Sequence, residues 1–116
     1  MLKNLPRAKL ANLPTPLHEV KRLSQVLGGP RIFFKRDDAT GLGLGGQKVR
    51  MLEFPLGDAL SKGCDVIVST GSEDANLATL VAACARKLGM DIVFIYLKKS
   101  RKELEGKALL TNLLDP

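Results

Sequence analysis

The sequence has no tryptophan, one tyrosine, one histidine and two cysteines. Because Cys64 and Cys84 have no second cysteine pair and no nearby histidine, we expect no metal site and interpret both as reduced thiols. His18 has no orienting carboxylate nearby apart from Glu19, so we interpret it as a surface residue. No apolar run approaches the ~20 residues that span a bilayer, and the first residues lack the apolar core of a signal peptide. We therefore expect a cytoplasmic protein that does not contact membranes.

The sequence has the composition of a globular protein and a net positive charge. The 116 residues are 45% apolar and 26% charged, which suits one modest folded domain. Lysine and arginine exceed aspartate and glutamate by 18 to 12, and much of the excess comes from one cluster: Lys98, Lys99, Arg101, Lys102 and Lys107. Such a cluster could contact phosphates, but no recognisable nucleic-acid module accompanies it. A solvated basic face is the better interpretation, and a basic nucleic-acid-binding protein is our third hypothesis.

The most informative stretch is glycine-rich, at residues 40–54, and reads Thr-Gly-Leu-Gly-Leu-Gly-Gly-Gln-Lys-Val-Arg-Met-Leu-Glu-Phe. Lys48 follows the last glycines at the expected start of a helix. The helix N-terminus and the neighbouring Arg50 both disfavour a charged ammonium, so we expect some free amine, the form that condenses with a carbonyl. The alternative is a glycine loop that carries an ordinary surface lysine.

Two nucleotide-binding motifs do not fit this stretch. Gly41, Gly43 and Gly46 have the G-x-G-x-x-G spacing, but polar residues 36–40 separate them from the preceding strand, and the next strand does not end in an acidic residue. A phosphate-binding loop of the Walker type needs lysine directly after the glycine, whereas Gln47 stands there.

The apolar spacing predicts the elements. A short amphipathic helix is expected over residues 17–27, followed by a strand over residues 31–35. The next helix pattern, residues 47–61, contains Pro55, which costs roughly 3 kcal/mol inside a helix, so we expect a kink or a restart there. A strand at residues 65–69, a turn at 70–72, a helix at 74–88, a strand at 92–97 and a helix at 101–114 complete the chain. This order predicts a right-handed parallel α/β unit.

Two segments of the sequence carry a family resemblance. Lys35-Arg36-Asp37-Asp38 is followed by Gly45-Gly46-Gln47-Lys48-Val49-Arg50-Met51-Leu52-Glu53. This pattern resembles the pyridoxal-phosphate enzymes grouped as 1-aminocyclopropane-1-carboxylate deaminase and D-cysteine desulfhydrase, which carry Lys-Arg-Asp-Asp and then Gly-Gly-Asn-Lys-x-Arg-Lys-Leu-Glu. The resemblance extends from residue 13 to residue 114. In these relatives the lysine binds pyridoxal 5'-phosphate as a Schiff base, and it corresponds to Lys48.

The resemblance also implies a fold class and a domain division. The class is α/β, a parallel βαβ three-layer unit that forms an incomplete tryptophan synthase β-like fold of type II. Residues 1–52 would belong to the larger pyridoxal-phosphate domain, including the Schiff-base lysine, and residues 53–116 to part of the smaller α/β domain.

A second site is expected at the turn before the helix over residues 74–88, where α/β proteins bind ligands. Relatives usually have Gln-Ser-Asn-His there, and this chain has Asp74-Ala75-Asn76-Leu77. The resemblance implies that Asn76 lies beside the cofactor ring and that Ala75, Asn76 and Leu77 form the substrate loop. Loss of the serine removes a hydrogen bond worth about 1 kcal/mol. Glu73 and Asp74 suit a helix cap but repel a substrate carboxylate.

Our leading hypothesis is a pyridoxal-phosphate-dependent lyase, a deaminase or desulfhydrase of a small amino acid, in truncated form. In the family, a later glycine-rich loop holds the phosphate of the cofactor, and a later residue contacts its pyridine nitrogen. Neither is found before Pro116, so we expect little or no activity from this chain alone. The alternative is a non-catalytic α/β module that binds a partner, such as a complementing chain or a second copy in a homo-oligomer. Since the strands need neighbours to bury both faces, we expect exposed apolar surface near residues 92–97 and self-association.

Overall fold

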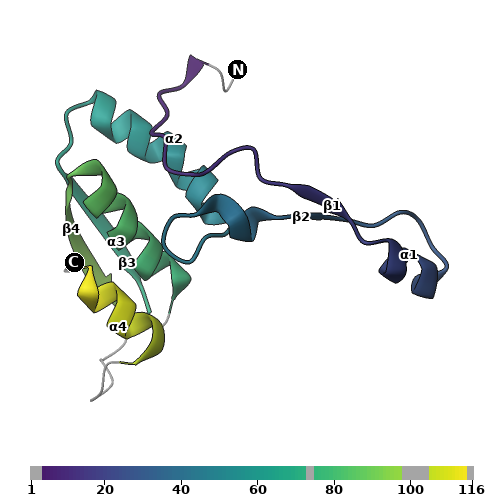
Figure 1. The fold of residues 1–116 in the computed structure, drawn as a ribbon. Helices are drawn as coiled ribbons and strands as arrows, with labels where there is room; N and C mark the ends of the chain where they lie inside the picture. Colours follow the sequence, from purple (N-terminus) through teal and green to yellow (C-terminus); the bar gives the residue numbers. More distant parts are fainter. Residues whose placement is uncertain (1–3, 73–74, 98–104, 115–116) are drawn as a thin grey trace.

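The computed structural model describes residues 4–72, 75–97 and 105–114. The elements are, in order, β1 (Leu17–Glu19), α1 (Lys21–Leu27), β2 (Phe33–Lys35), the short 3₁₀ helix η2 (Asp37–Thr40), α2 (Gln47–Ser61), β3 (Val66–Gly71), α3 (Asn76–Leu88), β4 (Asp91–Tyr96) and α4 (Gly106–Leu113). They form a body of α2, α3, α4, β3 and β4 and an arm of β1, β2 and α1 that projects from it (Figure 1).

The body contains the predicted parallel unit. Strands β3 and β4 pair in parallel, from Val66 opposite Asp91 to Gly71 opposite Tyr96, and α3 connects them. Helix α3 packs on the sheet through an apolar cluster that includes Val81, Ala85 and Ile92. The α/β class and the parallel pairing are therefore confirmed.

Several predicted boundaries move in this unit. Strand β3 continues through Gly71, because its last residues pair with β4, so the turn predicted at residues 70–72 begins too early. Helix α3 begins at Asn76 and ends before Gly89, whose φ of 69° is left-handed, as its glycine allows. The predicted start of the last helix, residues 101–104, lies outside the described residues, and α4 begins at Gly106.

A second apolar cluster joins the N-terminal segment, α2 and α3. Its buried side chains are those of Ala8, Leu10, Val49, Leu56, Leu80 and Cys84. Burial raises the pKa of the Cys84 thiol to about 11, so this cysteine stays protonated and unreactive at neutral pH. The cluster fixes α2 against α3, and the candidate site lies where these two helices begin.

The buried carboxylate of Glu53 attaches the N-terminal segment to α2. Glu53 is 1% exposed, and it accepts hydrogen bonds from the backbone N–H groups of Leu10 at 2.9 Å and Ala11 at 2.8 Å. Arg7 donates to the same carboxylate from Nε at 2.7 Å. The backbone carbonyl of Glu53 also accepts the N–H of Ala8 at 2.8 Å. Four residues of the segment are thereby held by one residue of α2.

The restart predicted at Pro55 is wrong, because α2 is a single helix from Gln47 to Ser61 with Pro55 inside it. Proline cannot donate to the carbonyl of Met51, but both residues are exposed, so water can satisfy that group. On the opposite side of α2, the backbone of Arg7 lies very close to Gly57. A Cβ atom on residue 57 would lie only 2.6 Å from the Cα of Arg7. The division of the chain at residues 52 and 53 stays a prediction, and α2 runs through it.

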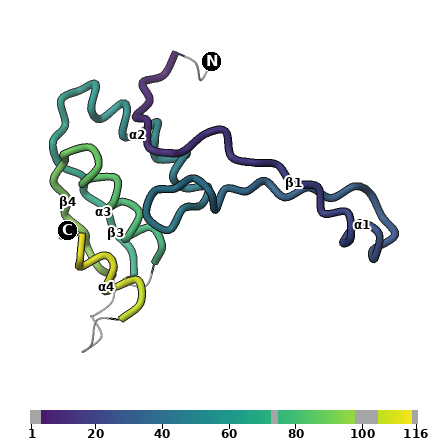
Figure 2. The backbone as a smooth tube through the Cα atoms, viewed as in Figure 1, coloured from purple at the N-terminus to yellow at the C-terminus, as the bar shows by residue number. Residues whose placement is uncertain are grey.

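The predicted helix over residues 17–27 is wrong in its first part. Leu17–Glu19 form β1, which pairs antiparallel with β2, and the helix begins only at Lys21. The pairing continues beyond the strands, since Arg36 N–H donates to the Pro16 carbonyl and Val20 N–H to the Ile32 carbonyl, both at 2.9 Å. Hydrogen bonds to β2 thus outweigh the helical spacing of the apolar residues. The resulting arm leaves the body as a narrow double strand (Figure 2).

One face of the β3–β4 sheet is uncovered by the described residues. Alternate side chains on the face opposite α3 are exposed, including Val68 at 67% and Ile95 at 54%. Val66, Val93 and Leu97 are exposed as well, whereas Ile92 faces α3 and is buried. The predicted apolar surface around residues 92–97 is therefore confirmed, except at Ile92 and at the partly buried Phe94, which pack with α3. Among the described residues, no helix is long and apolar enough to cross a membrane.

Replacement of Val68 and Ile95 by threonine should reduce the fluorescence of a hydrophobic dye and the apparent mass in light scattering. Threonine keeps the β-branched shape that suits a strand but makes the uncovered face polar. Leu60→Gln on α2 is the matched control, because it removes an exposed apolar side chain away from the sheet. Unchanged dye binding in the double variant would show that this face is not the surface that binds the dye or a second copy of the chain.

The Glu53 contacts predict a specific pH dependence of stability. Burial alone would raise the pKa of Glu53, but hydrogen bonds from Ala11, Arg7 and Leu10 outweigh it and lower the pKa. The stabilisation is complete above the unfolded-state pKa of about 4.3 and is lost as pH falls through the lower folded-state value. We expect Glu53→Gln to cost about 2 kcal/mol or more at neutral pH and to flatten the acid branch of the unfolding profile.

Urea unfolding at a series of pH values measures this effect. The control is Glu19→Gln, because Glu19 pairs with Arg31 at 2.8 Å on the surface and should matter little. An acid branch that is as steep in Glu53→Gln as in the unchanged chain would contradict the role given to Glu53.

Candidate functional site

The glycine loop and the first turns of two helices meet at one small cavity of about 170 Å³. Lys48 is the second residue of α2, and Asn76 is the first residue of α3. Both line this cavity, together with Gly45, Gly46, Gln47 and Leu80. The structure thus brings together the two residues that the sequence assigns to the cofactor, although 28 positions separate them.

Two glycines give the loop its shape before α2. Gly45 has φ of 71°, and a Cβ there would lie 2.3 Å from the carbonyl oxygen of Asp38, so no side chain fits. Gly46 has φ of 100° and directly precedes the helix. Its Cβ position is open, so the positive φ is what requires glycine. Both glycines therefore leave backbone rather than side chains at the wall of the cavity.

Hydrogen bonds close the loop on itself. Gly46 N–H donates to the Asp37 carbonyl at 2.8 Å, and the fully buried Thr40 hydroxyl lies 2.9 Å from that carbonyl and 3.1 Å from the Gly46 carbonyl. The backbone of Asn12 donates to the Thr40 carbonyl at 2.9 Å, which ties the loop to the N-terminal segment. The start of α2 is thus fixed by contacts from outside the helix.

The side chain of Lys48 is exposed, and none of the ion pairs formed within the described ranges involves it. Arg50 is already paired, since its Nη2 lies 2.5 Å from Oδ1 of Asp37 and 3.1 Å from the Thr15 hydroxyl. Asp37 thereby compensates the charge of Arg50.

The other predicted site residues have different surroundings. Ala75 precedes α3, donating its N–H to Ser72 at 3.1 Å and accepting the N–H of Ala78 at 3.0 Å. Leu77 packs against the α3–sheet cluster, and neither Ala75 nor Leu77 is among the residues that line the cavity. The predicted caps Glu73 and Asp74 lie outside the described residues.

A larger and more apolar cavity of about 420 Å³ lies on another side of the loop, between it, α3 and α4. Its walls are mostly leucine and alanine side chains, with Thr79 as a polar exception. None of the described residues that line this cavity is ionisable, so they offer no group for acid–base chemistry. The smaller cavity beside Lys48 is therefore the better candidate site.

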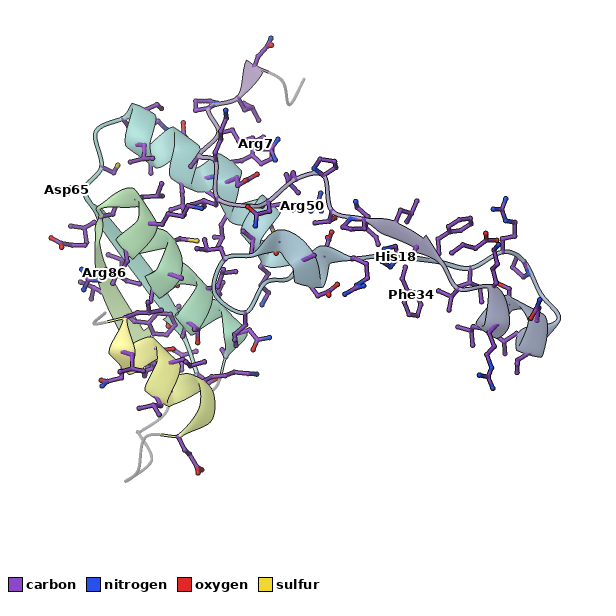
Figure 3. The ribbon with its side chains drawn as sticks, viewed as in Figure 1. Arg7, His18, Phe34, Arg50, Asp65 and Arg86 are labelled. Atoms are coloured by element: carbon purple, nitrogen blue, oxygen red, sulfur yellow. The ribbon has the colours of Figure 1, made fainter. Side chains whose placement is uncertain are left out.

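The interpretation of His18 as a surface residue is confirmed. His18 is exposed on the projecting arm, with Nδ1 3.4 Å from Nη1 of Arg36 (Figure 3). Most of the basic cluster, residues 98–102, lies outside the described residues. Sequence reasoning missed Thr15, Asp37 and Thr40 as residues that organise the loop, although the Lys-Arg-Asp-Asp segment was a signal for Asp37.

Comparison with known proteins gives a consistent result. The sequence model of a family described as "Pyridoxal-phosphate dependent enzyme" matches residues 8–115. A Pyrococcus abyssi protein, provisionally named a 1-aminocyclopropane-1-carboxylate deaminase, is 43% identical over 114 residues, which are 98% of this chain and 34% of that protein. A Klebsiella pneumoniae D-cysteine desulfhydrase is 46% identical over 92 residues, which are 79% of this chain and 28% of that protein.

A solved structure agrees with these matches. A crystal structure described as that of an ACC deaminase homologue has a TM-score of 0.86 and 39% sequence identity. The match covers 98% of this chain and 34% of the solved one. The chain thus spans about a third of the length of these relatives.

Proposed function

This chain belongs to the family of pyridoxal-phosphate-dependent enzymes, and on that premise we propose that Lys48 is the residue that attaches pyridoxal 5'-phosphate. We further propose a lyase reaction on a small amino acid, of the deaminase or desulfhydrase type named in its relatives. The supporting observation is the shared cavity, which Lys48 and Asn76 line together with Gly45 and Gly46.

The residues present suit cofactor attachment. Lys48 offers an exposed amine without an ion-pair partner among the described residues, and two glycines leave the wall beside it free of side chains. A cavity of about 170 Å³ is smaller than the roughly 300–1,000 Å³ of typical ligand sites. These residues therefore supply one wall of a site.

Pyridoxal phosphate, when bound, supplies an electron sink for the carbanion that forms on an amino acid. Lys48 would hold the cofactor through Nζ, and the same Nζ would take a proton from the substrate Cα or return one. The side-chain amide of Asn76 would orient the ring from the facing helix. The backbone N–H groups of Asn76 and Leu77, at the start of α3, would suit the substrate carboxylate, although Ala75 and Leu77 themselves do not line the cavity beside Lys48.

A second candidate is a non-catalytic module that binds a partner chain or a second copy of itself. The uncovered apolar face of the β3–β4 sheet favours it, since such faces are normally packed in parallel sheets. This candidate is compatible with low turnover by the 116-residue chain, which we also expect because Ala75 and Leu77 replace the usual serine and histidine of the family. For either candidate we propose a cytoplasmic location, because both cysteines are free.

Selective labelling tests the assignment of Lys48. Pyridoxal phosphate is added, borohydride fixes the adduct, and peptide mass spectrometry locates it. We expect Lys48 to carry more label than Lys62, which pairs with Asp58 at 2.6 Å, and more than the exposed Lys107. Lys48→Arg, which keeps the charge but removes the primary amine, should abolish the preferred site. Equal labelling of the three lysines would overturn the assignment and favour the module.

A further inference from the structure

Asp37 contacts the chain on both sides of Lys48, at the residue before α2 and within α2 itself. Its backbone carbonyl accepts the N–H of Gly46 at 2.8 Å, and its carboxylate Oδ1 lies 2.5 Å from Nη2 of Arg50. Gly46 and Arg50 stand two positions before and two positions after Lys48. One residue outside the helix therefore holds the chain two positions before and two positions after the lysine.

A third group completes this contact. The Thr15 hydroxyl donates to Asp37 Oδ1 at 3.0 Å and accepts from Arg50 Nη2 at 3.1 Å. Thr15 is buried, and the side chains of Arg50 and Asp37 are only 35% and 24% exposed. Charge-assisted hydrogen bonds in such a partly buried setting are stronger and more directional than surface pairs. Figure 3 places Arg50 where the N-terminal segment, η2 and α2 meet.

Helix geometry gives these contacts a consequence for Lys48. Successive residues of an α-helix are rotated by about 100°, so Lys48 and Arg50 lie on nearly opposite sides of the α2 axis. Attachment of Arg50 to Asp37 therefore directs Lys48 away from Asp37, while the Gly46 contact fixes the chain just before the helix. Asn76 lies on the side to which Lys48 turns, since both line the cavity between α2 and α3.

We propose that Asp37 is a positioning residue for Lys48, which it orients toward the cavity through its contacts with Gly46 and Arg50. This inference rests on the proposed attachment of pyridoxal phosphate to Lys48. Asp37 does not line the cavity, so it acts through α2.

The test compares Asp37→Asn, which removes the charge at nearly constant shape, with Asp37→Glu, which keeps it. Asp38→Asn is the matched control, because Asp38 pairs with Arg36 at 2.7 Å on the surface, and within the described residues its side chain forms no hydrogen bond with α2. Two readouts are taken after addition of pyridoxal phosphate: the labelled fraction at Lys48 relative to Lys62, and the induced circular dichroism of the bound chromophore. The induced circular dichroism reports a fixed orientation of the chromophore. If Asp37 only stabilised the fold, its replacement would leave this signal unchanged in the molecules that remain folded.

We expect Asp37→Asn to lower the preference for Lys48 by about 10-fold, since small misplacements of a reacting group cost 10-fold to 100-fold, and to abolish the induced signal. Asp37→Glu should restore part of both, and Asp38→Asn should resemble the unchanged chain. Arg50→Gln should lower the Lys48 preference as much as Asp37→Asn does. The double variant should lower it no further than either single variant, because both substitutions remove the same Asp37–Arg50 contact. Thermal unfolding shows whether each variant folds. If Asp37→Asn does not fold, Arg50→Gln takes its place in the comparison.

Normal labelling of Lys48 in a folded Asp37→Asn variant would overturn the inference and leave the proposed function intact. Absence of a Lys48 preference in the unchanged chain would instead overturn the proposed function. The positioning role is then decided by amide hydrogen exchange at Gly46 and Lys48 without any cofactor. Faster exchange in Asp37→Asn than in Asp38→Asn supports the role, and equal exchange contradicts it.

Discussion

The buried carboxylate of Glu53 is the interaction on which the rest of the body depends. A carboxylate removed from water is costly unless hydrogen bonds replace its solvation, and here backbone N–H groups and a guanidinium do so. These bonds hold residues 7–11 across α2, where Ala8 and Leu10 complete the apolar cluster with α3. Loss of the Glu53 contacts would weaken the cover that Ala8 and Leu10 give to Val49 and Leu56 on α2.

Two acidic residues therefore fix α2 at different points along its length. Asp37 fixes its first turns, and Glu53 fixes its middle. Helix α3 is placed in turn by Leu80 and Cys84, which pack against α2, and by the sheet on its other side. The distance between Lys48 and Asn76 is thus set by the packing of α2 against α3 and by the hydrogen bonds that hold α2.

Local signals in the sequence were sufficient for the parts of this account that depend on local chemistry. The family resemblance of residues 35–54 is confirmed by the family match over residues 8–115, and the parallel α/β class is confirmed by the pairing of β3 with β4. Gly89 marked the end of α3 correctly. The continuous apolar run at residues 92–97 predicted the uncovered sheet face, because such a strand needs cover on both sides.

Features decided by distant partners could not be predicted in this way. Leu17 has the helical spacing of α1, but its hydrogen bonds go to β2, a strand that lies beyond α1 in the sequence. Pro55 breaks a helix in isolation, and the support from the N-terminal segment is not visible in residues 47–61. Asp37 acts through residues as far away as Thr15 and Arg50, so its role required the folded structure.

The most direct test of the central claim is a nuclear magnetic resonance titration of the ¹⁵N-labelled chain with pyridoxal phosphate. If Lys48 and Asn76 form one site, the amide signals of Gly45, Gly46, Lys48 and Asn76 should shift together, with one saturation curve. Amides of the projecting arm, such as those of His18 and Phe34, serve as internal references and should stay in place. Shifts confined to other lysine-bearing surfaces, with the four site amides unchanged, would contradict the account.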